Sequence, residues 1–393
     1  MNILFWMSTS FQTTSRHLLI AILDELTAAG NRVTVLKKKV DDETEDLPEE
    51  LTGRDIQCIS IPVTASKKSN LIARYLKDVE YINKCKKYLD SSYDAVFVQS
   101  SNVAGLVFRE LRKKQPEAIK TFNVQDTFPQ NTVFSGTLSG KSLPYRLLKS
   151  IQSYAYKNSD YIITISEDMK ELLVNDCGVD PSKVEVVYNW SYGDLAYDPA
   201  SLNVEAVSHI FRKGYFNVVY AGNIGMMQNV DVIIEAAKLL KDHQSIWFQI
   251  IGNGVYRDKL QARAQEYGIK NISFLPMQPA ELAPSIYGLA GVNVIPLKQG
   301  VYKTALPSKT ATCMACQKPV IFAIGKKSEF GKRVAEETGC LLVDSDDAKE
   351  LADAITMIEA GTIEVKTSEF FYKNMTKTAN SRRYADIITG RKK

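Results

Sequence analysis

The chain has 393 residues, of which 45% are hydrophobic and 24% are charged, close to the average of globular proteins. This composition excludes wholesale disorder, a collagen-like fibre and a disulfide scaffold. The net charge of +4 is too small to indicate a nucleic-acid partner, and it is compatible with anionic ligands. Because a single core usually divides at this length, we expect two or three domains.

The cysteine pattern and the opening residues indicate a cytoplasmic protein. The six cysteines are scattered along the chain, as expected of reduced thiols rather than disulfides. The first residues have no basic region and no small-residue cleavage site, both of which a signal peptide would need. No run approaches 18 apolar residues, so no membrane-spanning helix is expected.

Strand-like and helical patterns alternate along the first half of the chain. An apolar run at residues 3–7 precedes a helical pattern from about residue 14 to residue 29, closed by Gly30 and Asn31 as C-cap residues. In ISEDM, Ser166 is the expected N-cap of another helix. Further expected strands lie at residues 32–36, 56–61, 95–98, 121–124, 161–165 and 184–187. Continuous apolar runs of this kind are typical of parallel strands that are covered on both faces.

The alternation restarts in the second half, after a stretch at residues 191–214 that is rich in glycine, proline and serine and has no clear period. The expected strands lie at residues 216–220, 247–251, 272–275, 292–297, 320–323 and 340–343. The expected helices lie at residues 230–241, 256–267, 280–288, 308–315 and 368–389.

These patterns predict an α/β protein with two doubly wound, Rossmann-like domains that face a cleft. We expect an N-terminal domain at residues 1–192, joined by a C-terminal helix at about 370–393. A linker is expected at 193–213 and a C-terminal domain at 214–369. In such sheets ligands bind outside the carboxyl ends of the strands, so we expect the ligands in the cleft between the domains.

Two glycine-containing turns follow strands of the second half and open helices. In AGNIGMMQN, Gly222 and Gly225 let the backbone approach an anion, which the N-terminus of the next helix would attract. In IIGNGVYRDKL, Gly252 and Gly254 serve tight backbone geometry or close approach of a ligand, and Arg257 can pair with a phosphate. The alternatives are glycines needed only for packing and an exposed helix arginine.

A lysine stands at the start of the expected helix in LPSKTATCMAC. Ser308 can cap this helix, which places Lys309 in its first turn. A cation is unfavourable there because the helix dipole is positive at that end. Lys309 is therefore expected to have an anionic partner; the alternative is a lysine that points to solvent.

Polar residues also follow strands of the first half. Asp126, in VQDTFPQ, comes just after a strand beside Phe128 and Pro129. Its carboxylate can bind sugar hydroxyls, act as a base or cap a loop. The hydroxyl-rich loop at residues 8–15 follows the first strand, and His17 next to it is a candidate for the cleft or a residue of a helix surface.

Several chemistries lack the residues they need. No Cys or His pair has the spacing of a zinc site, and neither a GxSxG elbow nor a Walker sequence occurs. We therefore expect no metal site and no cofactor.

Taken together, the motifs resemble those of glycosyltransferase family 4, whose members are retaining enzymes of the GT-B fold. The resemblance covers nearly the whole chain and depends on the order and spacing of its motifs. These motifs are VQDTFP, ISEDMKELLVNDCGVDPSKVEVVYNW, YAGNIGMMQNVDVIIEAAKLL, FQIIGNGVYRDKL, ISFLPMQPAEL and LPSKTATCMACQKPVI. The GNIG…QN and PSKT variants are most similar to the branch that builds capsule, O-antigen or exopolysaccharide repeat units, which includes the fucosaminyl-type transferases.

The resemblance implies that the C-terminal domain binds a nucleotide-sugar, usually UDP-linked, as a substrate. The diphosphate is then expected over residues 222–227 and the base near Pro276 and Met277. The expected donor-binding residues are Gly222, Asn223, Gly225, Met226, Gly252, Asn253, Gly254, Pro276, Met277, Thr304, Ser308 and Thr312. The expected acceptor-binding residues of the N-terminal domain are Ser8, Ser10, Gln12 and His17, together with Asp126.

The chain departs from the family pattern at four positions of its second half. The usual turn carries an arginine and a lysine that clamp the diphosphate, and Asn223 and Gln228 stand in their places. The family also has two glutamates with seven residues between them, and Thr304 and Thr312 occupy those positions. The resemblance therefore leaves Lys309 and Arg257 to supply positive charge, and it leaves sugar recognition open.

The implied reaction moves a sugar, often an N-acetylamino sugar, from UDP to a carbohydrate acceptor with retention at the anomeric carbon. The expected catalytic residues are Lys309, Asp126 and Arg257, in a metal-independent mechanism. One alternative is a UDP-sugar epimerase of the same fold, which needs carboxylates and a histidine in the cleft. Another is a non-catalytic subunit that binds UDP-sugar or acts as a scaffold, which the two missing glutamates favour.

The resemblance also implies a lipid-linked acceptor, since capsule-type acceptors are usually polyprenyl-diphosphate sugars at the cytoplasmic leaflet. Residues 111–114 (LRKK) and 143–157 (LPYRLLKSIQSYAYK) mix basic and apolar residues in the expected acceptor domain. Such a helix can lie on anionic lipid, so peripheral contact with the inner membrane is expected. The alternative is an ordinary packed helix with a solvated basic face.

Overall fold

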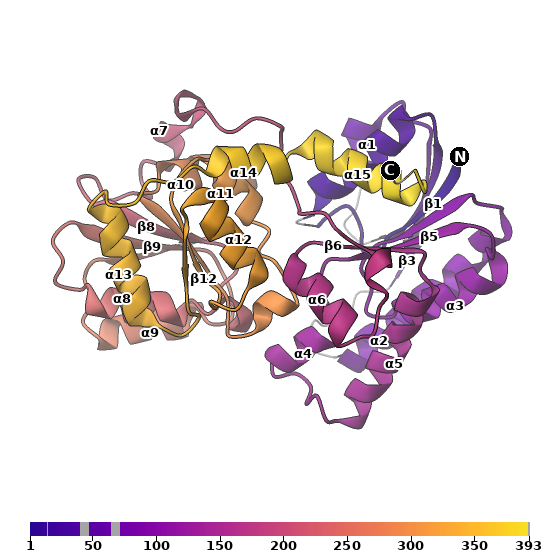
Figure 1. Cartoon of the computed structure of the whole chain (residues 1–393), viewed down its shortest axis with the longest axis horizontal. Coiled ribbons are helices and arrows are strands. Elements are labelled where there is room, and N and C mark those ends of the chain that lie inside the picture. Colours follow the sequence, from indigo (N-terminus) through magenta and orange to yellow (C-terminus); the bar gives the residue numbers. More distant parts are fainter. Residues whose placement is uncertain (14, 40–46, 64–70, 392–393) are drawn as a thin grey trace. The chain divides into compact units, whose positions relative to one another are not determined.

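The computed structural model describes residues 1–13, 15–39, 47–63 and 71–391, and its chain divides into two compact units. The first unit contains Met1–Asn189 and the C-terminal segment from Lys377, and the second contains Trp190–Thr376. Each unit is built on one parallel sheet with helices on both faces (Figure 1). This is the doubly wound α/β construction that the alternating pattern predicts.

The first unit holds a seven-stranded parallel sheet with strand order β3-β2-β1-β4-β5-β6-β7 within the described residues. Its strands are β1 (Asn2–Trp6), β2 (Arg32–Lys39), β3 (Ile56–Pro62), β4 (Ala95–Val98), β5 (Ile119–Val124), β6 (Tyr161–Thr164) and β7 (Val184–Val186). Strand β4, at the centre, is buried along its whole length, as its uninterrupted apolar sequence predicts.

Helices cover both faces of this sheet. They are α1 (Arg16–Ala28), α2 (Leu71–Cys85), α3 (Ala104–Lys114), α4 (Gln130–Phe134), α5 (Leu143–Asn158), α6 (Glu167–Asn175) and α15 (Lys377–Ile388). Helices α1 and α15 pack together, and so do α3 and α5. The expected start of α1 at residue 14 lies outside the described residues.

Two predicted helix caps of the first unit are confirmed. The Ser166 side chain accepts a hydrogen bond from the Met169 backbone at 3.2 Å, at the start of α6. Gly30 follows the end of α1 with a positive φ of 76°, a conformation that costs glycine little. Asn31 donates its side-chain amide to Leu26 O at 2.7 Å and satisfies a carbonyl of the last turn.

The second unit holds a six-stranded parallel sheet with strand order β10-β9-β8-β11-β12-β13. Its strands are β8 (Phe216–Ala221), β9 (Ile246–Ile251), β10 (Ile272–Leu275), β11 (Val292–Pro296), β12 (Val320–Ala323) and β13 (Leu341–Val343). Because all of them run in one direction, their carboxyl ends meet at one edge of the sheet, and the loops after them share that edge.

The helices of the second unit form two layers. They are α7 (Val204–Val207), α8 (Asp231–Leu239), α9 (Arg257–Glu266), α10 (Ala283–Leu289), α11 (Thr310–Ala315), α12 (Glu329–Thr338), α13 (Ala348–Glu359) and α14 (Thr367–Asn374). Helix α8 packs on both α9 and α13, whereas α10, α11, α12 and α14 form a second connected set. Apolar residues of α8, α9 and α13 share a core with β8, β9 and β11.

The prediction of a linker at residues 193–213 is wrong. This segment belongs to the second unit and contains a 3₁₀ turn at Pro199–Ser201 and helix α7. Val207 and Ile210 are buried in a small core with Val219 of β8 and Ile286 of α10. The segment lacks a period because its structure is irregular, but its apolar residues pack on the sheet.

The prediction of one final helix is also wrong. The chain forms α14 in the second unit and α15 in the first, separated at Met375 and Thr376. The C-terminal helix of the first unit therefore begins at Lys377 and not at about residue 370. The polar sequence of this region has no proline or glycine that would mark the break.

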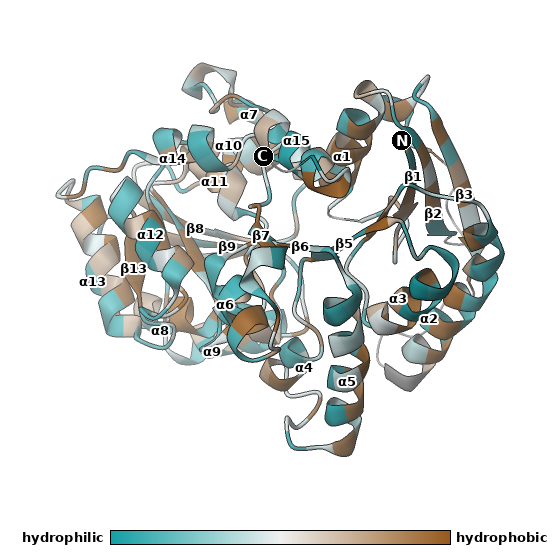
Figure 2. Ribbon diagram, turned by 45° about the vertical axis from the view of Figure 1, so that its right-hand side comes forward, coloured by the Kyte–Doolittle hydropathy of each residue, from teal (hydrophilic) through white to brown (hydrophobic). Residues whose placement is uncertain are grey.

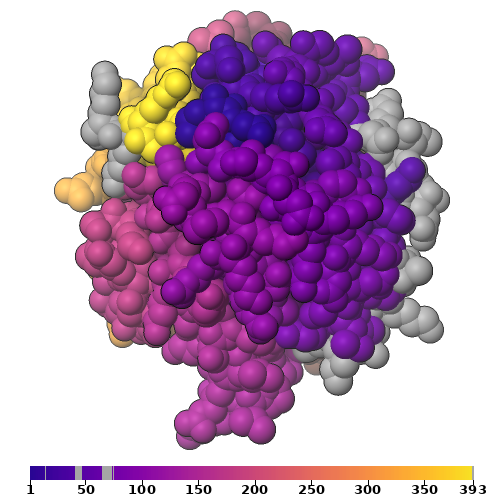
Figure 3. All heavy atoms as spheres, turned by 90° about the vertical axis from the view of Figure 1, so that its right-hand side faces the viewer, coloured from indigo at the N-terminus to yellow at the C-terminus, as the bar shows by residue number. Residues whose placement is uncertain are grey.

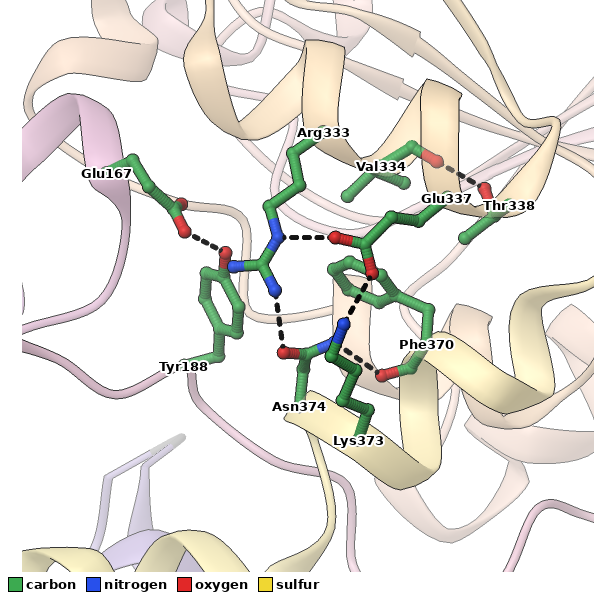
Figure 4. A network of polar contacts seen from close by, with 9 residues as sticks. All are labelled: Glu167, Tyr188, Arg333, Val334, Glu337, Thr338, Phe370, Lys373 and Asn374. Atoms are coloured by element: carbon green, nitrogen blue, oxygen red, sulfur yellow. Dashed lines mark hydrogen bonds and ion pairs between the residues drawn. The ribbon is translucent and has the colours of Figure 1, made fainter.

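Side chains of α12 and α14 hold these two helices together (Figure 4). Arg333 Nε lies 2.7 Å from Glu337 Oε1, and Arg333 Nη2 donates to Asn374 Oδ1 at 3.0 Å. Lys373 Nζ lies 3.4 Å from Glu337 Oε2. The Arg333 guanidinium also lies over the Phe370 ring, 5.6 Å from its centroid. This network fixes α14 within the second unit up to the point where the chain leaves it.

The turns after β8 and β9 approach each other so closely that one of them requires glycine. A Cβ added to Gly252 would lie 1.8 Å from Gly222 O, and Gly252 has a φ of +148°. The backbones are joined by hydrogen bonds from Gly222 N to Ile251 O at 2.9 Å and from Ile224 N to Asn253 O at 2.8 Å. Gly252 is therefore needed for the approach of backbone to backbone, which is one of the two functions predicted for it.

We predict that Gly252→Ala destabilises the second unit by about 3 kcal/mol or more, because the backbone of one turn must move. Gly268→Ala is the matched control: Gly268 also has a positive φ, of 65°, but nothing lies within 4 Å of an added Cβ. That control should lose only about 1 kcal/mol. Thermal melting of both variants measures the difference, and equal melting temperatures would contradict the account.

Candidate functional site

The turn after β8, residues Gly222–Asn229, is anchored to two other strand ends of the second unit. We call it the donor turn. Met227 O accepts a hydrogen bond from Lys298 N at 2.8 Å, just after β11. Asn229 has a left-handed conformation with φ 45°, and its amide donates to Ser345 O at 2.6 Å and to Asp346 Oδ1 at 3.1 Å, after β13. The turn is therefore held in place before α8 begins at Asp231.

The two residues that stand in place of the family's arginine and lysine contact each other in the donor turn. Asn223 Nδ2 donates to Gln228 Oε1 at 3.3 Å. A Cβ added to Gly225 would lie 2.7 Å from both of these side-chain atoms, so Gly225 provides the space in which they meet. Neither side chain carries charge, and an anion at this turn must be neutralised from elsewhere.

Lys309 reaches the donor turn from another part of the chain. Its ammonium lies over the Tyr220 ring, 3.9 Å from the centroid, in a cation–π contact. The same nitrogen lies 3.0 Å from where a Cβ on Gly222 would be. Tyr220 is buried in β8, and its hydroxyl donates to Asn223 O at 2.5 Å. The ring and the glycine together hold the ammonium at the start of the turn.

The environment of Lys309 shifts its protonation. The side chain is half-buried, and desolvation by the surrounding protein lowers the pKa of its ammonium to about 8. The described residues provide no carboxylate partner for it. An anion bound at Gly222 would supply the missing negative charge and raise this pKa again, which makes the position suited to an anionic ligand.

The start of α11 differs from the sequence prediction in one respect. Lys309 itself occupies the N-cap position, and the helix begins at Thr310. Ser308 is exposed and makes no capping hydrogen bond, because the Thr310 backbone and hydroxyl both bond to Pro307 O instead. The prediction of Ser308 as the cap is therefore wrong, and so is the placement of Lys309 in the first turn.

Arg257 lies at the first position of α9, and its guanidinium contacts the end of β10. Its Nη2 donates to Phe274 O at 3.3 Å, while its Nε is buried without a hydrogen-bond partner among the described residues. Pro276 and Met277, where the base is expected, follow directly and are exposed. The contact with Phe274 uses part of the guanidinium that was expected to bind phosphate.

The other expected donor-binding residues differ in exposure. Asn253 and Gly254 are exposed at the second glycine turn, and Met226 is exposed on the donor turn. Thr304 and Thr312 are buried. The Thr304 hydroxyl donates to Val301 O at 3.0 Å, within its own turn. Threonine side chains carry no charge, so Thr304 and Thr312 cannot supply the carboxylates of the two glutamates, and their predicted contact with the donor stays a prediction.

The expected acceptor-binding residues of the first unit lie after β1 and on α1. The Ser8 hydroxyl donates to Gln99 O at 3.4 Å, after β4. Ser10 is buried, and its hydroxyl accepts a hydrogen bond from the Gln12 backbone N–H at 3.1 Å. The Gln12 side chain is exposed. His17 lies in the first turn of α1 and is partly exposed.

Asp126 follows β5 in the first unit, at the carboxyl edge of its sheet. Asp126 is exposed to solvent. Protein atoms nearby nevertheless raise the pKa of its carboxyl through desolvation. The geometry allows the carboxylate to bind hydroxyl groups or to accept a proton, and the choice between these predicted functions and the capping of a loop stays open.

Four residues of these edges were not predicted: Tyr220, Asn229, Lys298 and Gln99. Tyr220 belongs to an apolar strand, where an aromatic residue indicates only core packing. Asn229 had a usable signal, because asparagine is the residue besides glycine that most readily adopts the left-handed conformation. The sequence also contained a signal for Lys298. This residue directly follows a strand, and ligands of parallel sheets bind outside the carboxyl ends of the strands.

Two features are absent from residues 1–13, 15–39, 47–63 and 71–391. No group of three or more His, Cys, Asp or Glu side chains there is arranged to hold a metal ion. No helix in those ranges combines the length and the apolar character that crossing a bilayer requires.

Family models match both halves of the chain. A model described as glycosyl transferases group 1 matches residues 205–378, and a model described as Glycosyltransferase Family 4 matches residues 17–190. The two matches lie on the second and the first unit respectively, apart from short segments at their ends.

Two named proteins are similar in sequence to this chain. WbjE of Pseudomonas aeruginosa, named as a probable glycosyltransferase, is 27% identical over 290 residues, which cover 72% of this chain and 71% of WbjE. WcaI of Escherichia coli K12, named as a putative colanic acid biosynthesis glycosyl transferase, is 27% identical over 189 residues. That alignment covers 48% of this chain and 46% of WcaI.

Solved structures share the fold. The lipopolysaccharide glycosyltransferase WaaG superposes with a TM-score of 0.70 at 15% identity, covering 99% of this chain and all of WaaG. The outer core galactosyltransferase WaaB gives 0.69 at 13% identity over the whole of both chains. HepE of Anabaena, in complex with UDP and glucose, gives 0.68 at 14% identity, covering 99% of this chain and 95% of HepE.

These likenesses establish a GT-B fold made of two Rossmann-like domains. The order of the two family matches along the chain is the same as the order of the two units. The chain therefore belongs to the glycosyltransferases, with a family 4 domain at residues 17–190 and a group 1 domain at residues 205–378.

Proposed function

We propose that this glycosyltransferase moves a sugar from a UDP-sugar to a carbohydrate acceptor, with retention at the anomeric carbon. The observation that carries the proposal is the Lys309 ammonium, held 3.9 Å from the centre of the Tyr220 ring beside the glycine turn. A cation with a lowered pKa and no carboxylate partner suits a pyrophosphate. The structure of HepE with UDP and glucose, on the same fold, supports a UDP-linked donor.

The residues of the second unit would act on the leaving group. Backbone N–H groups of the donor turn and the N-terminus of α8 would face the pyrophosphate. Lys309 would neutralise the charge that develops as the sugar–oxygen bond breaks. A pyrophosphate oxygen on the same face as the acceptor would take its proton, which needs neither a metal nor a carboxylate nucleophile. Asp126 and Ser8 of the first unit would bind acceptor hydroxyls.

The names of the relatives support a biosynthetic setting. WcaI is named for colanic acid biosynthesis, and WaaG and WaaB act in lipopolysaccharide synthesis by their titles. We therefore propose a role in bacterial surface polysaccharide synthesis, with a donor that is often an N-acetylamino sugar. The acceptor would be linked to polyprenyl diphosphate, and the protein would work at the cytoplasmic face of the membrane.

The proposal is tested by incubating the purified protein with a panel of UDP-sugars, with and without lipid-linked acceptors, after a thermal-shift screen has selected binders. Ligand at 100 times its dissociation constant adds about 2.7 kcal/mol to stability, which a melting curve detects. Transfer with the anomeric configuration retained supports the proposal. UDP binding without any transfer would favour the non-catalytic subunit, and conversion of UDP-sugar without acceptor would favour the epimerase.

We predict that Lys309→Met lowers the rate of transfer by about 100-fold or more, because one preformed charge on the leaving group is lost. The fold should not suffer at pH 7. Below pH 8 the native state keeps the desolvated ammonium charged at a cost, and methionine removes that cost. Lys303→Met, an exposed lysine of the same segment, is the control. Near-normal transfer by Lys309→Met would contradict the assigned function.

The pKa of about 8 for Lys309 also predicts how UDP affinity depends on pH. Below pH 8 the free protein carries the ammonium, and affinity should be constant once UDP is fully ionised. Above pH 8 binding must first return a proton, so the dissociation constant should rise by up to about tenfold per pH unit. Isothermal titration between pH 7 and 9 measures this. Lys309→Arg keeps its charge and should show no such rise; equal pH dependence of the two proteins would refute the prediction.

The contact with the membrane is proposed to involve α5 and the loop before it. Residues 127–159 contain four basic residues and no acidic one. Leu143 and Leu147, one turn apart at the start of α5, are 79% and 61% exposed, and Lys141 and Arg146 beside them are exposed as well. Figure 3 shows this part of the first unit standing out from its surface, and Figure 2 shows hydrophobic and hydrophilic residues along α5.

We predict that Leu143→Ser with Leu147→Ser weakens binding to vesicles with anionic lipid by at least about tenfold, since buried apolar area is lost. Leu76→Ser is the matched control, because Leu76 on α2 is also 61% exposed. Lys141→Glu with Arg146→Glu should weaken binding too, at about 1 kcal/mol for each basic residue removed. Co-sedimentation with vesicles measures the binding of all variants. If neither double variant binds more weakly than the wild-type protein, α5 is excluded as the membrane contact.

A further inference from the structure

The donor turn lacks the positive charge that a pyrophosphate needs. From Gly222 to Ala237 the sequence has no lysine or arginine, and Asn223 and Gln228 bond to each other. The Arg257 guanidinium is partly used by Phe274 O. Lys309 is then one cation against a ligand that carries at least two negative charges. One cation would leave a net negative charge in a partly desolvated place, which is unfavourable.

Lys298 lies beside the donor turn. Its backbone N–H donates to Met227 O at 2.8 Å, and it follows β11, the strand that pairs with β8. The residue is exposed. In the described part of the chain, its ammonium forms neither an ion pair nor a hydrogen bond.

Carboxylates near this edge are engaged elsewhere. Asp346 Oδ1 accepts the Asn229 amide at 3.1 Å, and Glu350 pairs with Lys326 and accepts from Asp344 N at 3.0 Å. None of these carboxylates forms an ion pair with Lys298, so its ammonium is available to an anionic ligand. A lysine has a flexible stem and three rotatable donors, so it can reach an anion over the turn without a change of backbone.

We propose that Lys298 is a donor-binding residue that pairs with the pyrophosphate and supplies the charge missing from Asn223 and Gln228. Lys298 belongs to the loop after β11, and its backbone hydrogen bond to Met227 O anchors this loop beside the donor turn. This inference rests on the proposed function, because it needs a nucleoside diphosphate at the donor turn. It adds a second cation to Lys309 and gives a reason for the two neutral residues in the turn.

The test compares UDP with UMP, because the second phosphate reports on the pyrophosphate cation. Lys298→Ala should weaken UDP binding by about tenfold and UMP binding by less than threefold, which a general loss of structure would not do. Lys303→Ala is the matched control: Lys303 is exposed, belongs to the same segment and has no ion pair in the described residues. It should leave both affinities unchanged.

A rescue separates charge from structure. Asn223→Arg in the Lys298→Ala protein returns a cation to the β8 turn and should restore most of the UDP affinity. If wild-type protein binds UDP and Lys298→Ala binds it equally well, the inference is overturned while the proposed function stands. If wild-type protein binds no UDP at all, both the proposed function and the inference fall.

Discussion

The ammonium of Lys309 beside the Tyr220 ring and Gly222 is the interaction on which the rest of the account depends. It brings the start of α11 to the end of β8, and it places a positive charge where the backbone leaves room for an anion. Desolvation makes this charge costly in the free protein and lowers its pKa. A position that costs stability without a partner is typical of a binding site rather than of a structural contact.

The parallel sheets explain why residues far apart in sequence meet at this edge. The order β10-β9-β8-β11-β12-β13 places the ends of β8 and β11 side by side. The donor turn therefore receives Lys309 and Lys298 from the segment after β11, while Asn229 reaches the loop after β13. The close approach of Gly252 to Gly222 O sets the distance between the turn after β8 and the turn after β9. Backbone contacts therefore shape this edge of the sheet, and lysine side chains supply its positive charge.

Most of the fold was predictable from the sequence because buried parallel strands are read from uninterrupted apolar runs. Each expected strand is present, and the cap at Ser166 follows from its hydroxyl, while that at Gly30 follows from the positive φ that glycine tolerates. The break between α14 and α15 was not predictable, since neither proline nor glycine marks it. The segment at 193–213 was not predictable as packed structure, because Val207 and Ile210 are isolated apolar residues in an irregular sequence.

The candidate site was predictable in part. The glycine turns and Lys309 follow from residue type and spacing, yet the pairing of Lys309 with Tyr220 depends on tertiary contacts that no local pattern encodes. The contact of Arg257 with Phe274 O likewise depends on a tertiary contact that the local sequence does not encode. The most direct measurement is a crystal structure with UDP bound. The account predicts a pyrophosphate oxygen within about 3 Å of Lys309 Nζ, over Gly222. A nucleotide seated elsewhere, with the donor turn closed by side chains, would contradict it.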